Sequence, residues 1–438
     1  MIGASDGRPM PGTARAPSRR EALAALAALA AAPGRDAQEP LAPAARRFLD
    51  DVQRRAVQFF VERADATTGL VHDRASNFGP DAYDVASIAA TGYGLAALPI
   101  GVARGWVRKE AALAQAGRAL RFLLGMPHAH GWLYHFVDAK TGARRWGCEA
   151  STIDTALLVL GALVCGRRFR GSDVERMAER LYERLDWTWA RTNGGARPDK
   201  LLVSHGWKPE SGFLPHDWDH YCEHLLLYLL GLGAPRNPLP EASWDAWTRT
   251  SFEYAGIRAL AAGPIFWHQM AFGYYDLRGR RDRLGYDYHA SSAAATRIHR
   301  QFCRNNPTRR KGYGPHGWGI NASDGPDGYR AYGVPQPEDG TLSPTGVLAA
   351  ITYEPRDAVE TAMRLRERLG ARVWGRYGFV NAYNEDRDWF DHDVIGIDLG
   401  MALLAIENHR SGLVWRLMAG HPSTMRAFRR AELRRAVT

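Results

Sequence analysis

Apolar residues recur at helical spacing along most of the chain, and strand-like alternation is scarce and short. Segments with one apolar stripe, such as LDDVQRRAVQFFVER and SDVERMAERLYERL, predict helices with a wide charged face. Other segments, such as TALLVLGALV and LLLYLLGLG, are apolar on nearly all sides and predict buried helices. Ser, Thr or Asp stands at several expected starts and Gly at several ends, as helix capping requires.

The alternation of these two kinds of helix predicts an all-α protein with an inner and an outer ring. No matching repeat of about 20 to 50 residues is visible, which argues against a binding solenoid. An (α/α)6 toroid fits best, with long loops that form a cleft at one end of the inner helices. We expect a single domain over residues 47–432, after a linker at residues 38–46.

Composition excludes few classes of protein. The hydrophobic fraction of 45% among 438 residues is sufficient for a large core. The formal charge of +10 comes from scattered arginines and the two tails, and no nucleic-acid motif accompanies it, so nucleic-acid binding is not expected. The four cysteines are widely spaced without a C-x-x-C pair, which argues against structural zinc and a disulfide scaffold, although one or two disulfides stay possible.

The N-terminus differs in kind from the rest. Ser18, Arg19 and Arg20 precede a short Ala/Leu run and then small residues. This layout predicts a twin-arginine-type export signal over residues 1–37, the alternatives being a flexible alanine-rich leader or a misassigned start. No later segment has about 18 continuous apolar residues, so stable membrane insertion is not expected. A periplasmic or secreted monomer is the expectation.

The segment from Trp374 to Trp415 carries acids among aromatic rings, directly before an apolar helical run. Rings cover the apolar faces of sugars, and carboxylates accept hydroxyl hydrogen bonds or move protons, so the segment predicts a sugar site. An acidic surface loop or a calcium loop are the alternatives. The acids are Glu385, Asp386, Asp388, Asp391, Asp393 and Asp398.

Two earlier segments add carboxylates. Glu149 stands at a helix entrance, and Asp154 lies in an otherwise apolar helix, where an acid is costly unless it is paired or lines a wet cleft. Glu210 stands in a loop with Trp207 and Phe213, where an apolar environment would raise its pKa towards that of a general acid. The alternatives are a capping carboxylate for Asp154 and a simple Pro-Glu turn for Glu210.

A third segment, FWHQMAFGYYDLRGRRD, offers rings and bidentate groups that are typical of sugar subsites, among them Tyr274, Tyr275, Asp276 and Arg278. The later Asp324-Gly-Pro-Asp327-Gly run lacks the twelfth-position acid of a calcium loop and predicts a turn that pins loops. No G-x-S-x-G, H-E-x-x-H or phosphate-binding loop motif is present, which leaves carboxylate chemistry as the most economical mechanism.

Ten ordered segments over about residues 45 to 432 resemble one known family. They are TGLVHDR, SIAATGYGLAA, CEASTIDTALLVLGALV, GWKPESGFL, YCEHLLLYLLGLGAP, FWHQMAFGYYDLRGRRD, HGWGINASDGPDGY, EDGTLSP, VWGRYGFVNAYN and IGIDLGMALLAIENHRSGLVW. Together they resemble the glucoamylase-like domain of endo-β-1,2-glucanases and of the transglycosylase part of cyclic β-1,2-glucan synthases.

The resemblance implies an (α/α)6 toroid that acts on glucan without a metal or organic cofactor. It also implies that acids matching Asp154, Glu210 and the cluster from Asp391 to Asp398 face the cleft. The chain departs from several members at Cys148, where they carry Ser, and at residues 270–272, where they carry His or Ser.

The resulting hypothesis is an enzyme that cleaves within a β-glucan, with β-1,2 linkage favoured. Glu210 would be the general acid and Asp393 the base, with Asp391 and Asp398 left open as bases. Asp154 and Glu149 would be supporting or alternative catalysts. A transglycosylase or a non-catalytic glycan-binding protein are the alternatives. The residues expected to contact the glucan or oligosaccharide are Asp73, Arg74, Tyr83, Asp138, Trp207, Trp218, Tyr221, Glu223, Trp267, His268, Gln269, Trp318, Asp391 and Asp398.

Overall fold

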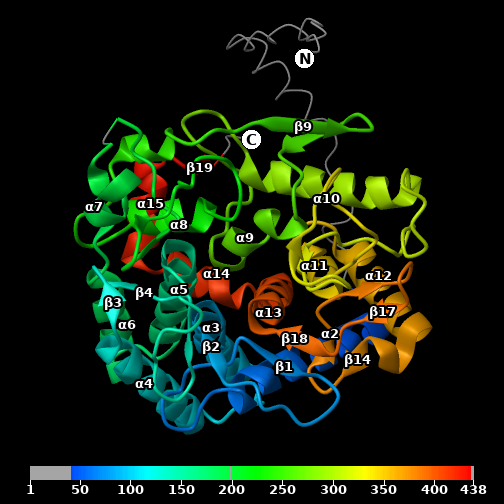
Figure 1. Cartoon of the computed structure of the whole chain (residues 1–438), viewed down its shortest axis with the longest axis horizontal. Coiled ribbons are helices and arrows are strands. Elements are labelled where there is room, and N and C mark those ends of the chain that lie inside the picture. Colours follow the sequence, from blue (N-terminus) through cyan, green and yellow to red (C-terminus); the bar gives the residue numbers. More distant parts are fainter. Residues whose placement is uncertain (1–40, 198, 436–438) are drawn as a thin grey trace, which may run out of the picture.

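A computed structural model describes residues 41–197 and 199–435, and this part of the chain is predominantly helical (Figure 1). The export signal predicted for residues 1–37 lies outside the described residues. The helices are α2 (Pro43–Glu62), α3 (Ile88–Ala103), α4 (Lys109–Gly125), α5 (Thr152–Arg168), α6 (Asp173–Glu183), α7 (Trp187–Ala190), α8 (Leu225–Leu232), α9 (Met270–Tyr274), α10 (Tyr288–Asn305), α11 (Pro344–Ala349), α12 (Pro355–Leu369), α13 (Gly396–Ser411), α14 (Leu413–Ala419) and α15 (Pro422–Arg430), with 3-10 turns at Thr192–Gly195, Glu241–Trp244, Ile265–His268, Ala350–Thr352 and Gly370–Arg372.

Two kinds of helix pack together as the hydrophobic pattern predicts. Helices α3, α5, α8 and α13 are buried along almost their whole length. Helix α3 packs between α5 and α13, α5 also contacts α8, and α13 also contacts α9 and α11. The amphipathic helices α2, α4, α6 and α12 lie outside this buried group (Figure 1). Their apolar residues are buried and their charged residues are mostly exposed.

The strands are two to four residues long and pair mainly within the loops. They are β1 (Arg74–Ser76), β2 (Val85–Ser87), β3 (His128–Ala129), β4 (Trp132–Leu133), β5 (Phe136–Asp138), β6 (Ala150–Ser151), β7 (Gly206–Lys208), β8 (Gly212–Phe213), β9 (Ser251–Tyr254), β10 (Ile257–Leu260), β11 (Arg280–Arg281), β12 (Ala322–Ser323), β13 (Arg330–Ala331), β14 (Trp374–Gly375), β15 (Gly378–Phe379), β16 (Tyr383–Asn384), β17 (Trp389–Phe390), β18 (Asp393–Ile395) and β19 (Arg434–Arg435).

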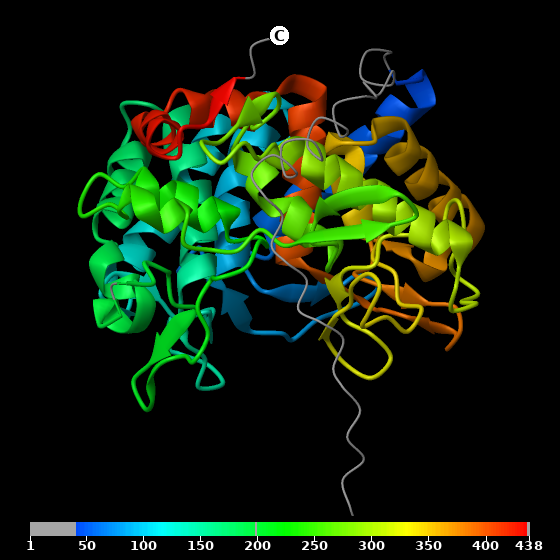
Figure 2. The ribbon, with the colours of Figure 1, turned by 90° about the horizontal axis from the view of Figure 1, so that it is seen from above.

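Three of these strands position the candidate site. Strands β2, β6 and β18 each end directly before the first residue of an inner helix, respectively α3, α5 and α13. The antiparallel pairs β1–β18 and β2–β5 and the three-stranded sheet β6–β7–β8 hold these entrances together. Figure 2 shows β-strand loops at one end of the helices and α15, in red, at the opposite end. Polar residues in the first turns of the inner helices therefore gather at one end of the molecule.

The start of the domain differs from the prediction. Helix α2 begins at Pro43, inside the segment predicted as a linker over residues 38–46. The reason is that a proline fits the first turn of a helix, where its missing N–H has no helical partner to lose.

The sequence also led to predictions about disulfide bonds and about membrane insertion. All four cysteines are free thiols in the structure. Among the described residues, no helix combines the length and the apolar character that a membrane span requires.

The crossing of α3 and α5 depends on glycine. A Cβ added to Gly161 would lie 1.8 Å from the backbone oxygen of Gly92, and one added to Gly92 would lie 2.5 Å from the Cα of Leu158. We expect Gly161→Ala to lower the free energy of unfolding by roughly 3 kcal/mol or more, because backbone atoms on both sides cannot yield. Urea denaturation measures this effect. Gly125→Ala in α4 is the control, since an added Cβ there meets no atom within 4 Å, and it should be neutral or stabilising by up to about 1 kcal/mol. Equal stability of the two variants would contradict the tight crossing.

Candidate active site

A cavity of about 450 Å³ lies at the entrances of the inner helices. Asp154 and Asp398 occupy the same third position of α5 and α13, and both are buried. Carboxylates are favoured there by the free N–H groups and the dipole of the helix N-terminus. The lining residues are Asp73, Arg74, Ser87, His135, Phe136, Ile153, Asp154, Leu157, Glu223, Phe266, Met270, Ala322, Tyr329, Ile395, Ile397 and Asp398.

Asp398 is a buried carboxylate in the wall of this cavity. Asn381 donates a hydrogen bond of 2.6 Å from Nδ2 to its Oδ2, which holds the carboxyl in place. Burial raises the pKa of Asp398 to about 7, and the negative charges of Asp324 and Asp73 add to the rise. The group therefore exchanges its proton near neutral pH.

Glu223 stands two residues before α8 and lines both this cavity and a neighbouring one of about 520 Å³. Its Oε2 is buried and has no hydrogen-bond partner among the described residues. Burial raises the pKa of Glu223 to about 7, with a further contribution from the charge of Asp154. A carboxyl group with this pKa is about half protonated at neutral pH and can donate its proton to a bound ligand.

The neighbouring cavity has aromatic walls. Trp218, Tyr221 and Trp267, all predicted as substrate contacts, line it together with Glu223. Trp218 is fixed by a hydrogen bond of 2.9 Å from its indole N–H to the Thr152 hydroxyl in the first turn of α5. Flat rings beside a proton donor suit the apolar face of a sugar ring.

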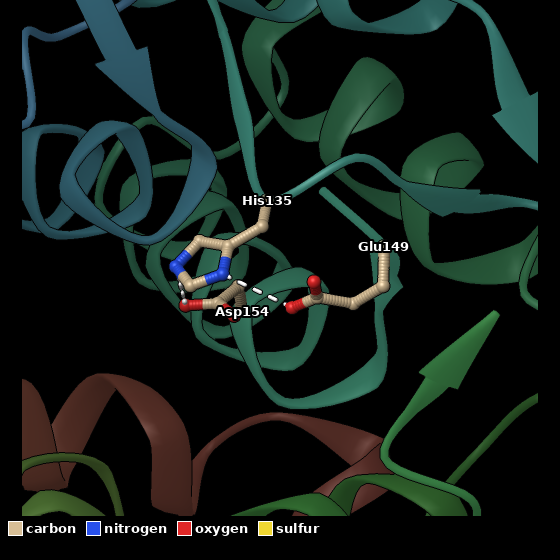
Figure 3. A group of neighbouring side chains, drawn as sticks. All are labelled: His135, Glu149 and Asp154. Atoms are coloured by element: carbon tan, nitrogen blue, oxygen red, sulfur yellow. Dashed lines mark hydrogen bonds and ion pairs between the residues drawn. The ribbon is translucent and has the colours of Figure 1, made fainter. Parts of the chain in front are cut away.

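His135 joins two of the predicted carboxylates (Figure 3). Its Nδ1 lies 3.1 Å from Glu149 Oε1, and its Nε2 lies 3.5 Å from Asp154 Oδ1. Burial disfavours a charged imidazole, but Asp154 and Glu149 outweigh it and raise the pKa of His135 to about 9. The bond from His135 in turn lowers the pKa of Glu149. The cluster is an imidazolium held between two carboxylates.

The same three residues bring ligand atoms within 4.8 Å of one another, a spacing that a metal ion could use. A metal on either ring nitrogen would have to replace a proton that the two carboxylates stabilise. The raised pKa of His135 therefore favours the protonated ion-pair cluster.

Arg74 forms ion pairs with acids from three loops. Its guanidinium lies 2.7 Å from Asp324, 3.5 Å from Asp393 and 3.6 Å from Asp73. The β1–β18 pairing places Asp393 opposite Ser76, next to this cation. Asp324, expected from the sequence to pin loops, accepts the shortest of these ion pairs.

Asp391, a further acid of the Trp374–Trp415 segment, lies close to Arg74, whereas Glu385 and Asp388 pair with Arg368 and Arg372. Asp391 accepts a hydrogen bond of 3.0 Å from the backbone N–H of Asp393. Burial raises the pKa of Asp391 to about 7, and it raises the pKa of Asp393, although Arg74 opposes the rise. Tyr83 lies nearby, and burial followed by Asp73 raises its pKa. Of the three possible bases, Asp398 is the one that lines the cavity.

Glu210 does not have the environment that the sequence suggested. It lies in the tight turn between β7 and β8, where 61% of its side chain is exposed. Arg144 donates two hydrogen bonds to the carboxylate and thereby lowers its pKa. The prediction of Glu210 as a general acid is wrong in its physical premise, because exposure and a cation favour the ionised form.

Seven predicted substrate contacts line neither cavity. Two of them, Tyr83 and Asp391, lie near Arg74. Asp138 accepts hydrogen bonds within its own turn, and Trp207 packs edge-on against another tryptophan. His268 is fully buried, and burial lowers its pKa to about 3. Gln269 and Trp318 are buried and donate to a backbone carbonyl and to a threonine hydroxyl respectively. These side chains support the loops around the site.

The fold brings several residues to the cavity that were not predicted from the sequence. His135 carried a weak signal, since it lies in the loop just before the acid-bearing segment of α5. Phe266 and Tyr329 line the cavity, and Asn381 orients Asp398. Only long-range contacts single these out, because each stands among similar polar or aromatic residues in its own loop.

Comparisons with known proteins find similarity to glucoamylase-like proteins and to a β-1,2-glucanase. Residues 215–422 match the Glycoamylase family model of glucoamylase-like proteins. A glucoamylase-like protein of Bacteroides caccae is 28% identical, with a TM-score of 0.83 over 90% of this chain and 100% of its own. An endo-β-1,2-glucanase of Chitinophaga pinensis, crystallised with sophorotriose and glucose, is 24% identical, with a TM-score of 0.82 over 90% of this chain and 99% of its own.

A curated relative adds a second kind of activity. It is an exo-β-1,2-glucooligosaccharide sophorohydrolase of Parabacteroides distasonis, 23% identical over 426 residues and 88% of this chain. The alignment covers 58% of that relative, so this chain spans less than two thirds of the relative's length.

Proposed function

We propose that this chain, whose residues 215–422 match the Glycoamylase family model, hydrolyses β-1,2-linked glucan, with Glu223 as general acid and Asp398 as general base. One observation carries the assignment of these two residues. Both carboxyl groups line one cavity, and the pKa of each is raised to about 7. The β-1,2 linkage rests on the named activities of the relatives.

In the proposed reaction, protonated Glu223 gives its proton to the glycosidic oxygen as the bond to the anomeric carbon breaks. Ionised Asp398 takes a proton from the attacking water, directly or through a sugar hydroxyl, and the water oxygen forms the new bond. The transition state carries positive charge on the sugar ring. Asp73 and Asp154, which also line the cavity, stabilise that charge.

The neighbouring groups hold this pair in position. The imidazolium of His135 fixes Asp154 and Glu149, so these two acids act as supports. Arg74 keeps Asp324 and Asp393 ion-paired beside the cavity. Of the three candidate bases, Asp393 is ion-paired with Arg74 and Asp391 does not line the cavity, so the proposed base is Asp398.

We place the cleavage point within the glucan chain. Glu223 lies in the walls of two cavities, so sugar units can bind on both sides of the proton donor. An enzyme that removed only terminal units would need one side closed. The (α/α)6 toroid, supported by alternating buried and amphipathic helices, supplies such a cleft at the entrances of its inner helices.

An exported, monomeric enzyme is the remaining part of the proposal. The export part rests on the paired arginines Arg19 and Arg20 and the apolar run that follows them.

The test is hydrolysis of a panel of β-1,2-, β-1,3-, β-1,4- and α-linked glucans, with product anomers followed by NMR. We expect reducing ends from linear β-1,2-glucan, at a rate at least about a hundredfold above the other linkages, with a mixture of product lengths at early times. Release of disaccharide alone would contradict internal cleavage. Linkage-preserving longer products would favour a transglycosylase, and absence of product from every glucan would overturn the proposed function.

A further inference from the structure

A second cavity, of about 410 Å³, lies far from the candidate active site. Asp398 is in the first turn of α13, whereas Asn408 and Ser411 near the end of that helix line this cavity. Thirteen residues of α-helix separate Asp398 from Ser411, which corresponds to about 20 Å at 1.5 Å per residue. Helices α14 and α15, at the end of the molecule opposite the β-strand loops, contribute further walls (Figure 2).

The walls of this cavity are strongly basic. Among its described lining residues are four arginines, Arg278, Arg280, Arg416 and Arg435, against one acid, Asp276. Asp276 is engaged by Arg278 through two hydrogen bonds of 2.8 Å. Arg280 and Arg435 form no ion pair with any described residue. The cavity therefore keeps a net positive charge after internal pairing.

The β11–β19 pairing holds these charges together. Arg280 is directly opposite Arg435, and Arg281 is directly opposite Arg434. Like charges opposite one another in an antiparallel pair repel, so this arrangement is unfavourable by itself. Burial and the charge of Arg435 lower the pKa of Arg280. A bound anion would remove the repulsion.

Buried hydroxyl groups provide an independent observation. Tyr274, Tyr275 and Thr424 line the cavity and are each more than nine-tenths buried. Their hydroxyl groups have no hydrogen-bond partner among the described residues. Buried polar groups are normally paired, and hydroxyls at a cavity wall suit a ligand with its own hydroxyl or acceptor groups.

We propose that this cavity binds a phosphorylated sugar. The arginines match the oxygens of a phosphate, which guanidinium groups bind in bidentate fashion. The free hydroxyls match a sugar, whose own hydroxyls need such partners, while the rings of Trp415 and Phe428 lie under the guanidinium groups of Arg278 and Arg280 and hold them at the cavity wall. The volume is within the range of small-molecule sites. The site uses residues Tyr274 to Arg278, which the sequence had suggested for the glucan itself.

Calorimetric titration of the full chain with glucose 6-phosphate, inorganic phosphate and glucose tests the proposal. We expect glucose 6-phosphate to bind at least about tenfold more tightly than inorganic phosphate, and glucose to bind at least about a hundredfold more weakly. Absence of glucose 6-phosphate binding up to about 10 mM, or equal binding of glucose and its phosphate, would overturn it. Equal binding of inorganic phosphate would also overturn it, by reducing the site to a plain anion site.

Single substitutions test whether glucose 6-phosphate binds in this cavity. Arg280→Gln should weaken glucose 6-phosphate binding about tenfold and Tyr275→Phe about threefold. Arg258→Gln is the matched control, because it removes one charge from an exposed arginine that pairs with Glu253 on β9. Glu223→Gln should bind glucose 6-phosphate like the parent, because the active cavity is elsewhere. Circular dichroism melting confirms folding of each variant. Loss of binding in Arg258→Gln or Glu223→Gln equal to that in Arg280→Gln would overturn the assignment.

Discussion

Replacing Glu223 by Gln is expected to lower the rate of β-1,2-glucan hydrolysis about a thousandfold, whereas Glu210→Gln should leave it within about twofold. Gln keeps the shape of the side chain and removes the proton that the glycosidic oxygen must receive. Glu210 is exposed and ion-paired with Arg144, so it has no proton to give near neutral pH. Reducing-end release at saturating substrate measures both rates.

The rates of the two variants can be compared directly, because the same change from Glu to Gln is made in each. A substrate with an activated phenol leaving group needs little protonation, so it should recover much of the rate in Glu223→Gln. That recovery separates loss of an acid from loss of binding. Full activity in Glu223→Gln, or collapse in Glu210→Gln, would return the acid role to the loop that the sequence had favoured.

Asp398→Asn is expected to lower activity about a thousandfold and to raise stability at about pH 8. The activity falls because Asn cannot accept a proton from water. The stability rises because burial lifts the pKa of Asp398 from 3.8 unfolded to about 7 folded. The folded protein thus holds this proton to higher pH than the unfolded chain. The stability that the protonated form contributes is present below about pH 4 and is lost as pH rises to about 7.

Above that range the wild-type protein carries a buried carboxylate that costs on the order of 4 kcal/mol, and the neutral Asn removes this cost. Thermal melting of parent and variant at about pH 8 and about pH 4 measures the difference. The melting temperature of Asp398→Asn should exceed that of the parent at the higher pH and equal it at the lower one. Asp393→Asn is the control, because Asp393 is partly exposed and paired with Arg74. A variant that keeps activity, or that is less stable at about pH 8, would argue against Asp398 as a buried base.

Local sequence patterns were sufficient to predict the helices. The run TALLVLGALV lies in α5 and LLLYLLGL forms α8, and both are buried on all sides. The pattern SDVERMAERLYE forms α6 with Ser172 as its N-cap. Side-chain periodicity and capping act within a few residues, so the sequence contains all the information that they need. The tight α3–α5 crossing through Gly92 and Gly161 was not visible, because it joins residues far apart in the chain.

The candidate site was only partly predictable. Sequence reasoning named Asp154, Glu223 and Asp398, which line one cavity, and it named Arg74 beside them. It preferred Glu210 and Asp393 for the chemistry, because both stand among aromatic residues in their own loops. Neither the cation that each of them meets nor the position of His135 follows from local sequence.

By itself, the sequence determined the helical class of this protein and the set of acids from which a site could be built. These properties depend on residue type and short-range spacing. The tertiary structure alone decided which acids are protonated near neutral pH, since the pKa of a carboxyl group depends on burial and on charges brought from distant loops. The long-range contacts of Arg144 with Glu210 and of Arg74 with Asp393, and the enclosure of Glu223 and Asp398 in one cavity, are the reasons for the acid and the base that we propose.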